Sequence, residues 1–76
     1  MKRLVILGGG ESGVGAALLG KEKEYKVFLS DSGKMAQTFI DVLIHNEIEW
    51  EDGGHTASKI LNADLVVKSP GIPDHI

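Results

Sequence analysis

The 76-residue chain contains no cysteine, which excludes disulfide bonds and thiol chemistry. Its apolar runs are short, and glycines follow the first of them at once, so neither a membrane-spanning helix nor a secretory signal is expected. The formal net charge of -3 gives no electrostatic reason to expect binding to nucleic acid or to a membrane surface. These absences favour a cytoplasmic protein and one small domain.

Residues that could catalyse a reaction or bind a metal are also sparse. His45, His55 and His75 are scattered, and no pair of them has the spacing of metal ligands. No nucleophile stands near a base, and the phosphate-binding pattern G-x-x-x-x-G-K-[ST] is missing. We therefore predict no catalytic residue and no metal site in this chain.

The chain is organised around residues 4–13, where four apolar residues precede a glycine-rich turn. The run Leu-Val-Ile-Leu is typical of a strand buried on both faces. Gly8, Gly10 and Gly13 then fit the pattern G-x-G-x-x-G. In this pattern the first glycine allows a tight turn, the second lets a phosphate approach the backbone, and the third lets the helix pack closely. The helix should begin at Ser12 or Gly13, and its unpaired N–H groups favour an anion.

The remaining segments alternate between strand and helix patterns. Apolar or alternating runs predict three more strands, at residues 25–30, 47–51 and 64–68. The strand at 47–51 should lie at an edge of the sheet, and the strand at 64–68 should be buried. Helices are predicted between these strands, at residues 34–46 and from a Thr56 cap to Leu61. The order βαβαβαβ predicts a Rossmann-like α/β fold, a parallel sheet with strand order 3-2-1-4.

Loops after three of these strands should meet at the carboxyl edge of the sheet. They are residues 8–13, 30–34 and 68–73. Asp31 stands where an acidic residue can accept a hydrogen bond from a ribose hydroxyl or a base N–H, although it could instead cap the following helix or be a turn aspartate. Ser69, Pro70 and Gly71 combine a hydroxyl, a fixed φ and a missing side chain, which suits either a rigid wall beside a ligand or a plain turn.

Together these motifs resemble the N-terminal domain of the Mur ligases, over essentially the whole chain. The resemblance rests on Gly8-Gly9-Gly10-Glu11-Ser12-Gly13, Asp31-Ser32, Gly53 followed by His55, and the ending Ser69-Pro70-Gly71-Ile72. Dehydrogenases share the glycine motif, whereas the Asp-Leu-Val-Val-Lys-Ser-Pro-Gly-Ile ending is much more specific.

The resemblance implies a binding site for the UDP part of a substrate. The residues that it implies are Gly8, Gly10, Glu11, Ser12, Gly13, Asp31, Ser32, Ser69, Pro70 and Gly71. The amides of Glu11 and Ser12 would bind the diphosphate. The Asp-Ser pair would hold the uracil end, and the Ser-Pro-Gly turn would wall the pocket. Some members place an arginine after the Asp-Ser pair, but this chain has Gly33 and Lys34, so no side-chain clamp over the base is assigned.

Members of this family have three domains, and the resemblance implies that residues 1–76 are the N-terminal, UDP-substrate-binding one. The whole protein would be an ADP-forming ligase of the branch that adds D-glutamate to UDP-N-acetylmuramoyl-L-alanine. That reaction belongs to peptidoglycan synthesis in the cytoplasm, and so to cell-wall formation, cell shape and cell division. ATP, Mg²⁺ and the catalytic residues would lie in the other two domains, its partners in the same protein. This domain alone should therefore bind no cofactor and be inactive.

Two other interpretations stay open at this stage. The chain could be the first half of an NAD- or FAD-binding domain of an oxidoreductase, since the glycine motif with an acidic residue after the second strand suits that use. It could also be a nucleotide-sensing module without chemistry. A second βαβ half beyond residue 76 would indicate a dehydrogenase, and a G-x-x-x-x-G-K-[ST] motif would indicate a ligase.

Overall fold

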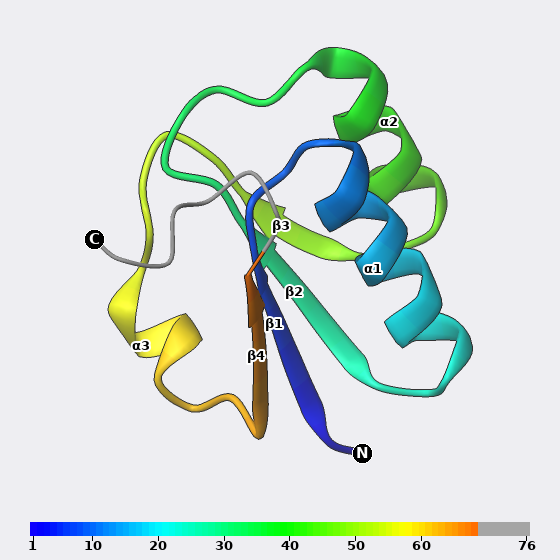
Figure 1. Ribbon diagram of the computed structural model, residues 1–76, viewed down its shortest axis with the longest axis vertical. Helices are drawn as coiled ribbons and strands as arrows, with labels where there is room; N and C mark the ends of the chain where they lie inside the picture. Colours follow the sequence, from blue (N-terminus) through cyan, green and yellow to red (C-terminus); the bar gives the residue numbers. More distant parts are fainter. Residues whose placement is uncertain (69–76) are drawn as a thin grey trace.

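Each run predicted as a strand forms one in the computed structural model, which describes residues 1–68 (Figure 1). The elements follow in the order β1 (Arg3–Leu7), α1 (Glu11–Glu22), β2 (Lys26–Ser30), α2 (Gln37–His45), β3 (Glu49–Glu51), α3 (Ala57–Ile60) and β4 (Leu65–Lys68). The predicted alternation of strands and helices is therefore confirmed. None of these helices is long and apolar enough to cross a membrane.

The four strands form one parallel sheet with the predicted order, β3-β2-β1-β4. β1 lies in its interior, with Val5 opposite Phe28 of β2 on one side and opposite Val66 of β4 on the other. This central position explains why Leu4, Val5 and Ile6 are all buried. Because the strands are parallel, the glycine loop after β1 and the turn after β2 begin side by side.

Helices α1 and α2 cover one face of the sheet, on the right in Figure 1. Apolar side chains from the sheet, both helices and the loops beside them form the core on this face, and they are Leu4, Ile6, Val14, Ala17, Val27, Leu29, Met35, Ile40, Leu43 and Ile48. Burying one large aliphatic side chain stabilises a fold by about 1.5–3 kcal/mol. This layer is therefore the main source of stability.

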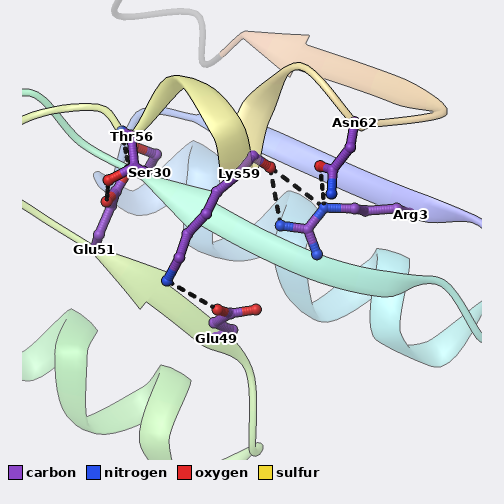
Figure 2. A network of polar contacts seen from close by, with 7 residues as sticks. All are labelled: Arg3, Ser30, Glu49, Glu51, Thr56, Lys59 and Asn62. Atoms are coloured by element: carbon purple, nitrogen blue, oxygen red, sulfur yellow. Dashed lines mark hydrogen bonds and ion pairs between the residues drawn. The ribbon is translucent and has the colours of Figure 1, made fainter.

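The short helix α3 packs on the opposite face, where Phe28 is fully buried. Arg3 Cζ and Lys59 Nζ each lie 5.4 Å from the centroid of its ring. The Arg3 guanidinium also donates to the Lys59 carbonyl oxygen and to Asn62 Oδ1, both at 2.9 Å (Figure 2). Lys59 Nζ pairs with a Glu49 carboxylate oxygen at 3.3 Å. These contacts hold in place a helix that is too short to be stable alone.

Both longer helices start at residues other than those predicted. α1 begins at Glu11, slightly before the predicted start. α2 begins at Gln37, later than predicted. The reason is that the Met35 N–H donates to Asp52 Oδ2 at 2.9 Å and the Met35 side chain is buried. This anchor keeps residues 34–36 out of the helix.

Both helices end in a Schellman motif in which a glutamate takes the place usually held by glycine. Glu24 follows α1 with a φ of 66°, and Glu47 follows α2 with a φ of 57°. After α1, the Tyr25 N–H donates back to the Gly20 carbonyl oxygen at 3.0 Å. The same motif after α2 uses up the first residues of the predicted third strand, so β3 is shorter than predicted.

The sequence predicts that the last strand is buried, but β4 is exposed along its length. The exposed fractions are 47% for Leu65, 46% for Val66 and 36% for Val67. β4 lies at an edge of the sheet, and β1 is its only neighbour among residues 1–68. The prediction of burial is therefore wrong for the part of the chain that the structure describes. Apolar composition alone does not tell an interior strand from an edge strand.

Candidate nucleotide-binding site

Two of the motif glycines are required by the fold itself. Gly8 has a φ of 116°, in a region that favours glycine, and its N–H donates to the Ser30 carbonyl oxygen at 2.8 Å. A Cβ atom on Gly13 would lie 1.8 Å from the carbonyl oxygen of Gly8. The tight turn and the close packing expected at these positions are both observed. The turn and the close packing place the amino end of α1 at the carboxyl end of β1.

Gly10 differs, because nothing in the described part of the protein requires a glycine there. Its φ of -83° and ψ of -169° suit any residue, and an added Cβ would meet no described atom within 4 Å. The Val14 N–H donates to the Gly10 carbonyl oxygen at 2.9 Å, so the amides of residues 10–13 have no acceptor within the helix. Free amides at the positive end of a helix form a site for an anion such as a phosphate.

The carboxylate of Asp31 lies between the glycine loop and its own turn. Its Oδ2 accepts a hydrogen bond from the Gly9 N–H at 2.8 Å, and its Oδ1 accepts one from the Gly33 N–H at 2.9 Å. Asp31 does not cap the next helix, because Ala36 is the N-cap residue of α2. The alternative that it is a turn aspartate is observed, since its Oδ1 accepts from the N–H two residues further on. Ser32 is exposed beside it. Each carboxylate oxygen retains a lone pair that can accept from a ligand.

The loop after β3 completes this edge of the sheet. The Gly53 N–H donates to the Gly33 carbonyl oxygen at 2.9 Å, and the Gly54 N–H donates to that of Asp31 at 3.2 Å. The Asp31 N–H in turn donates to the Glu51 carbonyl oxygen at 3.0 Å. Backbone hydrogen bonds therefore join the loops after β2 and β3, and the Asp31 side chain joins them to the glycine loop.

A polar cluster that the sequence pattern does not reveal supports this edge. The hydroxyl of Ser30 is fully buried; it donates to Glu51 Oε2 at 2.7 Å and lies 2.6 Å from His55 Nδ1. Glu51 also accepts from the Thr56 N–H at 2.7 Å and from the Thr56 hydroxyl at 2.6 Å (Figure 2). Thr56 holds the predicted N-cap position of α3, but its hydroxyl binds Glu51 instead of capping. The alternation in residues 47–51 predicts only a solvent-facing carboxylate.

This cluster should make the stability of the fold sensitive to acid. Burial raises the pKa of the Glu51 carboxyl, but hydrogen bonds from Thr56 and Ser30 and the charge of Lys59 outweigh burial and hold the pKa below its ordinary value of 4.5. A carboxyl with a lowered pKa stabilises the folded state above its unfolded pKa and loses that contribution as the pH falls through the folded pKa. Urea unfolding at a series of pH values from 7 to 3 gives the free energy of unfolding of each variant. As the pH is lowered past 4.5, this free energy should decrease less for Glu51→Gln than for the wild type. Glu22→Gln, on an exposed helix face, should follow the wild type, and equal curves for all three would contradict the prediction.

The other predicted site residues, Ser69, Pro70 and Gly71, lie outside the described residues, as does His75. Within residues 1–68, no group of three His, Cys, Asp or Glu side chains could hold a metal ion. His45 is the last residue of α2, and His55 belongs to the polar cluster. The described residues thus bring together the glycine loop, the Asp-Ser turn and the loop after β3.

A parallel sheet of this order, with a glycine loop at its carboxyl edge and a helix end whose first amides have no acceptor among residues 1–68, defines the class of Rossmann-like α/β domains. Within that class, residues 3–75 match the family model described as the MurD N-terminal domain. The chain belongs to this family.

Curated relatives of the chain carry the name UDP-N-acetylmuramoylalanine–D-glutamate ligase. The relative from Christiangramia forsetii is 63% identical over 73 residues, which cover 96% of this chain and 16% of the relative. The relative from Bacteroides thetaiotaomicron is 54% identical over 74 residues, which cover 97% of this chain and 17% of the relative. The resemblance to the Mur ligases is therefore confirmed, and the chain spans 16–17% of the length of these relatives.

Proposed function

We propose that these residues form the UDP-binding part of an ATP-dependent ligase that adds D-glutamate to UDP-N-acetylmuramoyl-L-alanine. Membership of the MurD N-terminal domain family and the names of the relatives support the ligase. The observation that carries UDP binding is the free amino end of α1 behind Gly10. The ligase would act in the cytoplasm, in peptidoglycan synthesis, and so contribute to cell-wall formation, cell shape and cell division.

The diphosphate binds at the amino end of α1 in this proposal. The amides of Glu11 and Ser12 donate to the phosphate oxygens, and the helix dipole favours the negative charge. Gly10 has no side chain, so a phosphate can reach these amides without meeting a Cβ atom. Gly8 and Gly13 act indirectly. The tight turn at Gly8 and the close packing at Gly13 orient the amino end of α1 toward the ligand.

The uridine end lies over the turn after β2. Asp31 accepts from the base or ribose through the lone pairs that its two backbone contacts leave free, and Ser32 contributes its exposed hydroxyl. By family position, the Ser-Pro-Gly turn at residues 69–71 walls the pocket. Lys34 is exposed and follows Asp31 by three positions, so its charge could replace the arginine of other members.

By family position, ATP and Mg²⁺ are bound by the other domains of the ligase in this proposal. The complete ligase would transfer a phosphoryl group from ATP to the substrate carboxylate, and the amine of D-glutamate would then displace that phosphate. In this proposal residues 1–76 hold the nucleotide end of the substrate and take no part in either step. By themselves they should neither hydrolyse ATP nor form the amide bond.

The proposal is tested by titrating the ¹⁵N-labelled chain with UDP, UDP-N-acetylmuramoyl-L-alanine and NAD while recording amide shifts. Both UDP compounds should shift the amides of residues 9–13 and 31–33, while NAD at the same concentration should leave them in place. Shifts with NAD and none with UDP would overturn the proposal in favour of a dinucleotide-binding domain.

A further inference from the structure

Asp31 is the side chain that links the two halves of the proposed UDP site. Its carboxylate accepts from the amide of Gly9 at 2.8 Å and from the amide of Gly33 at 2.9 Å. Gly9 belongs to the glycine loop, the proposed phosphate loop, and Gly33 belongs to the turn after β2, where the uridine is proposed to lie. Gly9 and Asp31 are 22 positions apart in the sequence, so the first contact is purely tertiary. One carboxylate therefore connects the two loops directly.

The phosphate loop is held on the other sides as well. The Gly8 N–H donates to the Ser30 carbonyl oxygen at 2.8 Å, and an added Cβ on Gly9 would lie 2.6 Å from Met35 Sδ. Gly9 is buried, whereas Gly10, the next residue, is exposed and begins α1. The Asp31 carboxylate thus binds the Gly9 amide, which directly precedes the amides at the start of α1 that are proposed to bind the diphosphate.

The charge of Asp31 is unfavourable for an anion in the neighbouring loop. A carboxylate repels a phosphate group through Coulomb's law, and partial burial weakens the screening by water. If this side chain only touched the uridine, its removal would strengthen the binding of a free phosphate to the loop. If it orders the loop, its removal would weaken that binding. The two roles therefore predict opposite signs.

We propose that Asp31 is a positioning residue for the diphosphate, acting through the Gly9 amide, in addition to its contact with the uridine. This inference rests on the proposed function. It makes the base and phosphate subsites interdependent, because a substitution of Asp31 then changes the affinity for a ligand that has no base.

The experiment compares Asp31→Asn with Asp64→Asn in the 76-residue chain. Asp64 Oδ2 also accepts a backbone N–H, from Arg3 at 2.7 Å, but at the amino end of β1, so this variant removes the same charge away from the loop. In Asp31→Asn the side-chain NH₂ faces one of the two backbone donors, and the remaining oxygen is a weaker, uncharged acceptor, so the Gly9 contact is either lost or weakened. The probes are inorganic pyrophosphate, uridine and UDP, titrated by NMR. The dissociation constant of pyrophosphate should rise at least tenfold in Asp31→Asn and stay unchanged in Asp64→Asn.

Pyrophosphate binding that is unchanged or tighter in Asp31→Asn, with a loss confined to uridine, would overturn the inference. A wild-type chain that binds neither UDP nor pyrophosphate would instead overturn the proposed function. Hydrogen exchange of the Gly9 amide gives a reading that needs no ligand. Exchange should become at least tenfold faster in Asp31→Asn at an unchanged melting temperature, and an unchanged rate would reject the ordering of the loop. If Asp31→Asn does not fold, Asp31→Ala, which also removes the charge and removes both backbone contacts, takes its place with the same expected directions.

Discussion

Replacing Gly10 by valine should abolish detectable UDP binding and leave the fold intact. A branched side chain at this position stands between the diphosphate and the free amides of α1. We expect the affinity to fall at least about a hundredfold, which corresponds to roughly 2.7 kcal/mol. The fold should tolerate the change, because the backbone of Gly10 is extended and the space around its Cβ position is open among the described residues. Valine is a poorer N-cap residue than glycine, so a stability loss of up to about 1 kcal/mol is expected.

Gly15→Val is the matched control for this prediction. A Cβ atom on Gly15 also meets no described atom within 4 Å, but this residue lies inside α1 and away from its free amides. UDP titrations and thermal melts of both variants should therefore separate binding from folding. Normal UDP affinity in Gly10→Val would show that the diphosphate does not lie on this loop.

The sheet could be predicted from the sequence because its signals are local. The apolar run 4–7 is followed at once by glycines, which defines both a buried central strand and the turn after it. Alternating strand and helix patterns then leave few topologies, since right-handed crossovers and short connections fix the order of the strands. The steric role of Gly13 could also be predicted, because it depends only on a spacing that is visible in the sequence.

Several features that could not be predicted depend on contacts between distant residues. Met35 stays out of α2 because its amide meets Asp52, which lies 17 positions further along the chain. Glu51 looks like one of several alternating surface glutamates, but it accepts from Ser30, 21 positions away. Whether Asp31 caps a helix or reaches the glycine loop also depends on where the next helix begins. Periodicity contains no information on such pairings, so alternatives stayed open there until the structure was known.

Replacing Gly13 by alanine should cause the largest loss of stability among single-methyl substitutions in α1. The new Cβ would lie 1.8 Å from the carbonyl oxygen of Gly8 and 2.8 Å from its carbonyl carbon, so α1 would have to move away from β1. Overpacking costs about 1–3 kcal/mol when side chains can adjust, and more when the backbone must shift. We expect a loss of about 3 kcal/mol or more, and a fall in melting temperature of roughly 12–24 °C for a domain of this size.

Two glycines of the same helix provide the contrast for Gly13→Ala. At Gly20 the added Cβ would meet Leu4 Cδ2 at 2.4 Å, the far end of a side chain that can rotate, so Gly20→Ala should cost less than Gly13→Ala. At Gly15 the space is open, and Gly15→Ala should raise the stability by about 0.5–1 kcal/mol because alanine favours the helix. Thermal melts of the three variants should therefore rank Gly15→Ala above wild type, then Gly20→Ala, then Gly13→Ala. A melting temperature for Gly13→Ala close to that of the wild type would mean that α1 does not pack on the Gly8 carbonyl as the structure places it.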